Sequence, residues 1–381
     1  MLKEVVLKFY LLLVKEFFRL FSYFPLKRRT VMLSSFGDNL SYINDSLYHK
    51  GLSDVIVLKE SSCKKDFKHA QKVLKFSPKH PLSFFTGLYY LATSKMIFID
   101  NYHVILASCD FKKDVVVSQV WHANGAVKYF GLRDKTIVHR PKSAHRRFRS
   151  VYKTFNKVVV SSDDMAYIFS EAFGLSDNNI LKTGLARTDY YFDKKQVNED
   201  RVKVRQGLNL DSKTKVILYA PTYRDGHLND SQLLLNLKTV SEKLPGYHIL
   251  VKLHPAMSAH YDYESVFVTN VSQGYTIESL MAASDILITD YSSIPYEYCI
   301  LNKPMYFYIN DIDEYQEERG IWFDFESYMP GPACKNEDSL IDNLLNETAD
   351  LNKVKAFNKR VNKYADGHSS DRLVDTLYKN F

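Results

Sequence analysis

Polar side chains that can take part in catalysis cluster directly after four apolar runs of this 381-residue chain. In open α/β sheets, ligands bind beyond the carboxyl ends of the strands, so each cluster falls where an active site is expected. The clusters comprise His122 with Asn124 and Gly125, Thr222 with Arg224, His254, and Asp290 with Ser292 and Ser293. A single polar strand end is common, but four drawn from both halves of the chain indicate an active site that combines imidazole, hydroxyl and guanidinium groups.

The two serines have a clear expected chemistry. Ser292 and Ser293 follow an apolar run and precede a predicted helix at 294–301. Their hydroxyls and the free N–H groups of the first helical turn would bind an anion such as a phosphate. Ordinary capping of the helix by serine is the alternative. The chain contains neither G-x-x-x-x-G-K-[ST] nor G-x-G-x-x-G, which argues against a P-loop or a standard dinucleotide site.

The elements that must position these clusters alternate between apolar runs and segments of helical length. This alternation is typical of parallel sheets covered by helices on both faces. We therefore expect an α/β protein with two Rossmann-like, doubly wound domains, at residues 30–195 and 205–360. Residues 1–29 precede them, and a C-terminal helix at 361–381 is expected to pack back on the first domain.

The first 24 residues combine an apolar surface with a narrow polar stripe. The stripe and the basic cluster after it consist of Glu4, Lys8, Lys15, Arg19, Lys27, Arg28 and Arg29. The longest uncharged apolar run, 9–14, is far shorter than the ~18 residues of a membrane-spanning helix. We therefore predict an amphipathic helix in the membrane interface, with basic residues facing anionic lipid. A helix buried on its own protein, or an oligomer contact, is the alternative.

The net charge of +7 is unevenly distributed. Residues 1–30 carry a net charge of +5 and residues 128–157 carry +9, so the rest of the chain is net acidic. This asymmetry indicates two local anionic partners and argues against general nucleic-acid binding. A solvated helix is the alternative for the second run. The four cysteines form no C-x-x-C pair, which favours a reducing cytoplasm over a disulfide framework or zinc site.

Seven segments resemble, in order and spacing, the CDP-glycerol glycerophosphotransferase family of wall teichoic acid synthesis. They are WHANGAVKYFGL, LKTGLARTD, ILYAPTYRD, VKLHP, DILITDYSSIPYEYCILNKPMYFY, YQEERG and DGHSSDR. The resemblance extends from about residue 95 to residue 372, and WHANG and VKLHP look most like the primases of the family. It implies the glycosyltransferase B architecture, with the acceptor on the N-terminal domain and the donor nucleotide on the C-terminal domain.

The implied reaction is the transfer of glycerol phosphate from CDP-glycerol to a hydroxyl of an undecaprenyl-diphosphate-linked N-acetylmannosaminyl-N-acetylglucosamine, with release of CMP. Such an enzyme would work at the cytoplasmic face of the cell membrane, as a peripheral protein on an anionic surface. The resemblance indicates no cofactor, and a divalent ion stays an open alternative. The D-x-D pattern of Asp311 and Asp313 lies in an acidic loop that is more typical of plain surface.

The resemblance also implies roles for individual residues. His122 is the candidate general base, because an imidazole with a pKa of ~6.5 accepts a proton near neutral pH; a structural histidine is the alternative. His254 would stabilise the negative charge on departing CMP. The expected donor-side residues are Thr222, Arg224, His254, Asp290, Ser292, Ser293, Glu297, Arg319 and Gly320. The expected acceptor-side residues are Asn124, Gly125, Lys128 and Arg187.

Three other functions compete with this one. A teichoic acid glycerol-phosphate polymerase would add many units where a primase adds one. A sugar-nucleotide glycosyltransferase of the same architecture would release UDP in place of CMP, and the fold alone does not separate the two. A non-enzymatic lipid- or nucleic-acid-binding protein could use the basic run at 128–157, but it would leave the four polar clusters unexplained.

Overall fold

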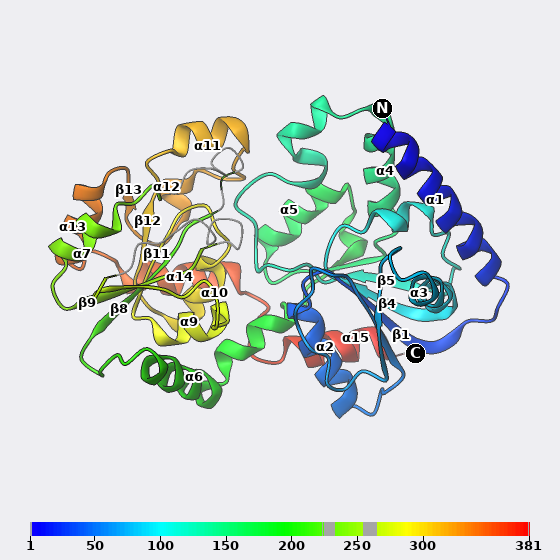
Figure 1. Cartoon of the computed structure of the whole chain (residues 1–381), viewed down its shortest axis with the longest axis horizontal. Coiled ribbons are helices and arrows are strands. Elements are labelled where there is room, and N and C mark those ends of the chain that lie inside the picture. Colours follow the sequence, from blue (N-terminus) through cyan, green and yellow to red (C-terminus); the bar gives the residue numbers. More distant parts are fainter. Residues whose placement is uncertain (1, 223, 225–232, 254–264, 380) are drawn as a thin grey trace. The chain divides into compact units, whose positions relative to one another are not determined.

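The computed structural model describes residues 2–222, 224, 233–253, 265–379 and 381, and the chain divides into two compact units (Figure 1). The first unit comprises Met1–Ala123, Phe130–Asp189 and Tyr364–Phe381. The second comprises Asn124–Tyr129 and Tyr190–Lys363. The chain therefore enters the second unit briefly at Asn124, which a division into consecutive domains does not anticipate.

The first unit is built on a seven-stranded, all-parallel sheet with the order β3-β2-β1-β4-β5-β6-β7. Its strands are β1 (Lys27–Ser34), β2 (Val55–Lys59), β3 (Lys72–Lys75), β4 (Ser94–Ile99), β5 (Val116–Gln119), β6 (Lys157–Val159) and β7 (Ile180–Leu181). The central strands β1 and β4 carry buried apolar runs at 31–33 and 96–99, because both faces of the sheet are covered there. Its helices include α1 (Leu2–Phe21), α2 (Asp38–His49), α3 (Pro81–Thr93), α4 (Lys142–Tyr152), α5 (Asp163–Phe173) and α15 (Ser369–Tyr378).

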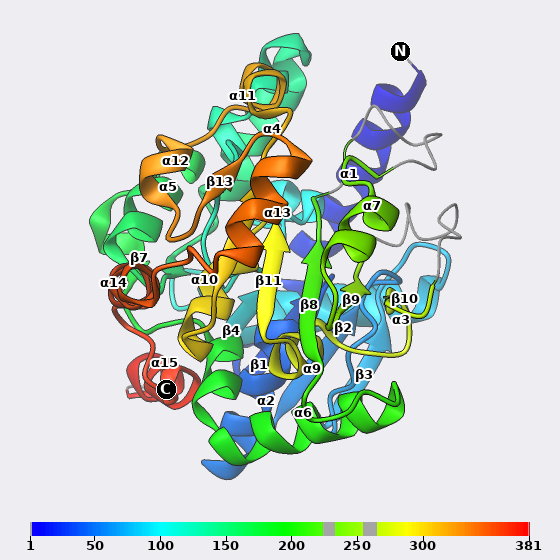
Figure 2. The same cartoon turned by 90° about the vertical axis from the view of Figure 1, so that its left-hand side faces the viewer.

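The second unit is built on a six-stranded, all-parallel sheet with the order β10-β9-β8-β11-β12-β13 (Figure 2). Its strands are β8 (Lys215–Ala220), β9 (Tyr247–Val251), β10 (Val268–Asn270), β11 (Ile286–Thr289), β12 (Met305–Tyr308) and β13 (Ala333–Cys334). Its helices include α6 (Lys194–Gly207), α7 (Leu237–Lys243), α9 (Ile277–Ala283), α10 (Pro295–Tyr298), α11 (Ile312–Glu318), α12 (Phe325–Tyr328), α13 (Glu337–Leu345) and α14 (Leu351–Val361). Two Rossmann-like parallel sheets confirm the predicted fold class at this level.

Helix α1 packs on the first unit along one side only. Val14 and Phe18 are buried, and the Phe17 ring lies 4.3 Å from the ring of Phe85 in α3. At its other end, Glu4 accepts two hydrogen bonds of 2.9 Å from Arg147 of α4. Large apolar side chains remain exposed on the helix, and they are Val5, Val6, Phe9, Leu12, Leu13 and Leu20. None of the helices in the described part of the chain has the length and apolar character needed to cross a bilayer.

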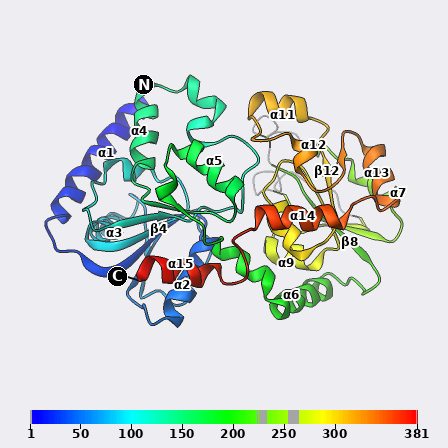
Figure 3. The same ribbon diagram turned by 180° about the vertical axis from the view of Figure 1, so that it is seen from behind.

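The C-terminal helix α15 belongs to the first unit and packs against α2 (Figure 3). Asp189 holds its first turn: the carboxylate accepts bonds from the backbone N–H groups of Ser369 and Ser370, both at 2.8 Å, and from the Ser370 hydroxyl at 2.7 Å. A carboxylate at this position satisfies free N–H groups and complements the positive end of the helix. This contact gives the aspartate of LKTGLARTD a structural role.

We therefore expect Asp189→Ala to lower the free energy of unfolding by about 1–3 kcal/mol, because three bonds to a charged acceptor are lost. The measurement is urea unfolding followed by circular dichroism. Asp114→Ala, at an exposed aspartate of the same unit, is the matched control and should change stability by less than about 0.5 kcal/mol. Equal stability of the two variants would contradict the anchoring role.

Candidate active site

His122 lies just beyond β5 and is held in one tautomer by the backbone. Its Nδ1 lies 3.1 Å from the carbonyl oxygen of Asp100. A carbonyl only accepts hydrogen bonds, so Nδ1 must carry the proton. In the neutral ring, Nε2 then keeps its lone pair, which is the arrangement that a general base requires.

The His122 ring is sandwiched between two aromatic rings. Phe36 stacks on it at a centroid distance of 4.1 Å, and Trp121 stacks at 4.4 Å. Burial lowers the pKa of His122 below its usual value, and the positive charge of Arg187 acts in the same direction. The bond to Asp100 opposes this shift but does not reverse it. The ring is therefore neutral at physiological pH.

A network of backbone contacts fixes the segment that carries His122. Trp121 has a φ of 56°, a left-handed conformation that is costly for a bulky residue. The Asn39 side chain donates to the carbonyls of Val120 at 3.0 Å and Trp121 at 2.9 Å, while the Trp121 N–H donates to the Gln119 side chain at 2.9 Å. These bonds hold the strained turn in place.

Arg187 completes this network from the LARTD segment. Its guanidinium donates to the carbonyl of His122 at 2.9 Å and pairs with Asp38 at 3.4 Å. Its backbone N–H donates to the Asn39 side chain at 2.9 Å. Arg187 was expected on the acceptor side, and it does lie in the first unit, where it braces the backbone of the candidate base.

Asp100 is fully buried at the end of β4 and was not among the predicted site residues. Its carboxylate accepts bonds from the backbone N–H groups of Ser35 at 2.8 Å, Phe36 at 3.1 Å and Gly37 at 2.7 Å. Burial raises the pKa of Asp100, but His103 and these N–H groups outweigh it and keep the pKa below its ordinary value. The signal was present in the sequence, because KMIFID ends in an aspartate as ILITD does.

The first unit does not contain three residues that we expected on the acceptor side. Asn124, Gly125 and Lys128 belong to the second unit, and their placement on the N-terminal domain was wrong. The Asn124 side chain donates to the Tyr296 carbonyl at 3.1 Å and to Asn362 at 2.7 Å. Gly125 has a φ of 99°, and a Cβ there would lie 2.4 Å from the Tyr296 ring. Lys128 forms an antiparallel bridge with Ile321.

The strand ends of the second unit meet around Asp290. Its carboxylate accepts a bond from the Thr222 N–H at 2.8 Å and another from Arg224 at 2.9 Å. Arg224 also pairs with Asp311 at 2.8 Å, and its guanidinium lies 5.0 Å from the centre of the Tyr291 ring. The structure thus brings Thr222, Arg224 and Asp290 together, as the polar clusters predicted. Arg224 therefore pairs with two carboxylates, those of Asp290 and Asp311.

The serine cluster follows β11 directly. The Ser292 hydroxyl accepts the Ile294 N–H at 3.2 Å and lies 3.0 Å from the Thr289 hydroxyl. This bond forms a local turn ahead of α10, whose first turn has no side-chain cap, so it is not the helix capping that we named as the alternative to anion binding. Ser293 is half-buried and follows it. The phosphate-binding role of the two serines stays a prediction.

The remaining donor-side predictions fall in different surroundings. Glu297 is buried and accepts a bond of 2.8 Å from the Tyr191 hydroxyl, and its binding of ribose stays a prediction. Arg319 ends α11, and Gly320 follows with a φ of 72°. A Cβ on Gly320 would lie 2.3 Å from the Tyr129 ring, so packing and the positive φ both favour glycine, and its proximity to phosphate stays a prediction. His254 lies outside the described residues. No group of His, Cys, Asp or Glu that could hold a metal ion occurs among the residues described.

Comparison with known proteins confirms the family resemblance. The family model described as CDP-Glycerol:Poly(glycerophosphate) glycerophosphotransferase matches residues 16–379. A teichoic acid glycerol-phosphate primase of Bacillus subtilis (strain 168) is 40% identical over 302 residues, which cover 78% of this chain and 77% of that protein. A primase of the same name from Bacillus spizizenii (strain ATCC 23059 / NRRL B-14472 / W23) is 33% identical over 374 residues, 96% of each chain.

A solved structure of the wall teichoic acid polymerase TagF has a similar fold. Its TM-score is 0.79 at 23% identity, and the match covers 100% of this chain and 95% of that one. At this level of identity the likeness shows the fold alone.

The packing of Gly320 leads to a stability prediction. Gly320→Ala must place a methyl group against the Tyr129 ring and keep a left-handed backbone, whereas Gly246→Ala meets nothing within 4 Å at a φ of 87°. We expect Gly246→Ala to cost about 1 kcal/mol from backbone strain alone, and Gly320→Ala to cost about 1–3 kcal/mol more from overpacking. Urea unfolding of both variants measures the difference. Equal costs would show that the Tyr129 contact is not what requires the glycine.

Proposed function

The chain belongs to the CDP-Glycerol:Poly(glycerophosphate) glycerophosphotransferase family, and from this we propose that it primes wall teichoic acid synthesis. It is a glycerophosphotransferase, and its proposed donor is CDP-glycerol. The proposed acceptor is a hydroxyl of undecaprenyl-diphosphate-linked N-acetylmannosaminyl-N-acetylglucosamine. Both glycerol-phosphate primases described above match this chain over most of their own length, which favours the priming reaction over polymerisation.

The observation that carries the proposal is the fixed tautomer of His122. The acceptor hydroxyl gives its proton to Nε2 while its oxygen attacks the phosphorus that bears glycerol. The bond from that phosphorus to the CMP oxygen breaks, and CMP leaves with the electron pair. The proton on Nδ1 stays bonded to the Asp100 carbonyl, 3.1 Å away, so the ring keeps its orientation as it becomes positively charged.

We propose that the donor binds at the strand ends of the second unit. Thr222, Ser293 and Arg319 supply hydroxyl and guanidinium groups of the kind that bind phosphate oxygens. Arg224 is already bonded to Asp290 and Asp311, so its proposed role is to position these strand ends. CDP-glycerol carries an activated phosphorus, and we propose that no cofactor takes part.

We also propose that the enzyme works as a peripheral protein at the cytoplasmic face of the membrane. An acceptor with a long polyprenyl chain stays in the bilayer, so the transfer must happen at its surface. The exposed apolar side of α1 suits insertion into the interface. The neighbouring helix α4 adds exposed basic residues that suit anionic lipid, and these include Lys142, Arg146 and Arg149.

The reaction itself can be tested directly. Purified protein is incubated with CDP-glycerol and a lipid-linked N-acetylmannosaminyl-N-acetylglucosamine, and the products are weighed by mass spectrometry. One added glycerol phosphate together with released CMP supports the proposal. A ladder of products would support a polymerase, and an absence of transfer with this donor would overturn the proposal.

We expect His122→Ala to lower the transfer rate by roughly 10²–10⁴-fold, because a general base is lost, while CDP-glycerol binding is retained. The pH at which the wild-type rate falls to half should lie below the ~6.5 of an ordinary histidine, since burial lowers the pKa of His122. Initial rates and donor binding by calorimetry, each across pH, measure both effects. Near-normal turnover in the variant would exclude His122 as the base.

We expect the double variant Phe9→Ser, Leu12→Ser to bind anionic liposomes at least tenfold more weakly, because each buried large apolar side chain contributes about 1.5–3 kcal/mol. Both side chains are more than half exposed, so the fold should tolerate the change. The matched control is Leu345→Ser, Leu351→Ser, at exposed leucines of the second unit. Sedimentation at low and high salt separates apolar from electrostatic binding. Equal binding by both variants would contradict the membrane role of α1.

A further inference from the structure

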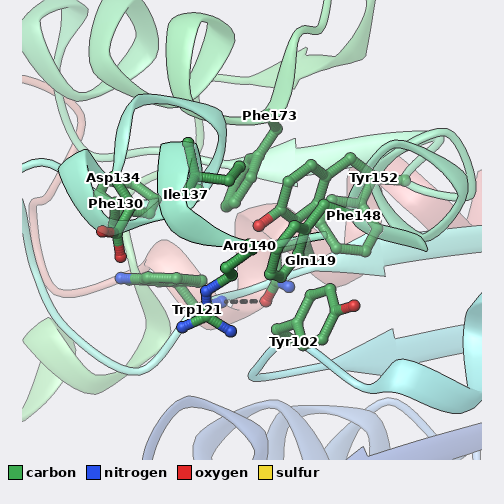
Figure 4. A pocket seen from close by; sticks show the side chains of 12 residues that line it. Tyr102, Gln119, Trp121, Phe130, Asp134, Ile137, Arg140, Phe148, Tyr152 and Phe173 are labelled. Atoms are coloured by element: carbon green, nitrogen blue, oxygen red, sulfur yellow. Dashed lines mark hydrogen bonds between the residues drawn. The ribbon is translucent and has the colours of Figure 1, made fainter. Parts of the chain in front are cut away.

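A pocket of about 330 Å³ opens in the first unit between helix α4 and the segment that carries His122 (Figure 4). It is lined by Tyr102, Gln119, Trp121, Phe130, Gly131, Asp134, Ile137, Arg140, Phe148, Tyr152, Phe155 and Phe173. We call it the Trp121 pocket. Neither the proposed base nor the proposed donor site uses this space.

The lining of the Trp121 pocket combines aromatic rings with a few polar groups. Seven of the twelve residues are aromatic, and Arg140, Asp134 and Gln119 add a guanidinium, a carboxylate and an amide. Figure 4 shows Arg140 reaching into the pocket toward Trp121. Such a mixture suits a ligand with apolar ring faces and polar edges, since aromatic walls with a few polar groups are typical of small-molecule sites.

The pocket is coupled directly to the candidate base. Trp121 lines the pocket and also stacks on His122 at 4.4 Å, so a ligand against Trp121 lies about one ring away from the imidazole. Trp121 adopts its left-handed φ of 56° at this same point. Strain of this kind persists where the surrounding structure enforces it, and it is concentrated at functional sites.

We propose that the Trp121 pocket binds an N-acetylated pyranose ring of the acceptor and so holds the acceptor beside His122. This inference rests on the proposed function. A pyranose stacks its C–H face on aromatic rings and offers hydroxyl and amide groups to Arg140, Asp134 and Gln119. The volume is at the lower end of the ~300–1,000 Å³ typical of small-molecule sites, which suits a sugar ring and is too small for a long polyprenyl chain.

The rim of the pocket fits the rest of the acceptor. Arg140 immediately precedes α4, whose exposed basic residues Lys142, Arg146 and Arg149 continue from the rim. A sugar in the pocket would therefore place an attached diphosphate next to a cationic surface. This gives the basic run at 128–157 a chemical role that its composition alone did not define.

The test compares Arg140→Met and Phe148→Ala with Lys113→Met, which removes one positive charge from an exposed site of the first unit outside both the pocket lining and α4. Wild type and variants are assayed with CDP-glycerol and a short-chain, water-soluble lipid-linked disaccharide. We expect the acceptor KM to rise about tenfold or more in the two pocket variants, with the donor KM unchanged. Lys113→Met should stay within about twofold of wild type.

A binding measurement keeps this inference separate from the proposed function. Saturation-transfer NMR with the free N-acetylated disaccharide should show contact with wild type and a loss of signal in Phe148→Ala, whatever the transfer activity. A wild-type enzyme that transfers glycerol phosphate, with acceptor KM unchanged in both pocket variants, would overturn the pocket alone. A short prenyl diphosphate without sugar that displaces the disaccharide would show a lipid site and would also overturn it. An absence of any transfer by wild type would instead refute the proposed function.

Discussion

A buried aspartate at the reversal point of each parallel sheet is the constraint on which both units depend. Strand ends carry backbone N–H groups into the loops that follow, and a buried group without a partner costs about 1–3 kcal/mol. Asp100 accepts three such N–H groups after β1, and Asp290 accepts the one at Thr222 after β8. Asp100 follows β4, which pairs with β1, and Asp290 follows β11, which pairs with β8. In each sheet, the strand order reverses between these two paired strands. In both units, therefore, an aspartate accepts backbone N–H groups from the loop that follows the first strand of the sheet.

In the first unit this constraint also creates the candidate base. The Asp100 carboxylate fixes the backbone of Phe36, whose ring stacks on His122, while the Asp100 carbonyl fixes the tautomer of His122. The carboxylate is balanced by His103, which lies 3.8 Å from Asp100 and 3.1 Å from Glu60. Burial lowers the pKa of His103, but the two carboxylates raise it to about 9, so it is positively charged at neutral pH. A structural ion cluster thus lies next to the residue whose carbonyl orients the ring of the candidate base.

The sequence predicted those elements whose buried position requires apolar side chains. Continuous apolar runs predicted the central strands, but they do not cover the edge strands: KVLK of β3 is mostly exposed, and β13 is only two residues long. The strand ends predicted which side chains gather at Asp290, since parallel strands end at one edge. They could not show that Asn124 bonds to Tyr296 and Asn362, because that contact joins segments far apart in the sequence. Nor could they show that Gly320 packs against the Tyr129 ring, and its proximity to phosphate stays a prediction.

The position of Trp121 shows why strain occurs next to the base. One side of the indole stacks on His122, and the residue also lines the Trp121 pocket, so its orientation affects both the imidazole and any bound ligand. A relaxed extended backbone would send the side chain elsewhere. The bonds from Asn39 and to Gln119 offset a left-handed conformation that costs about 1–2 kcal/mol. Because one ring contacts the candidate base and lines the pocket, a ligand that displaced the indole would also shift the imidazole, which under the proposed function would link acceptor fit to proton transfer.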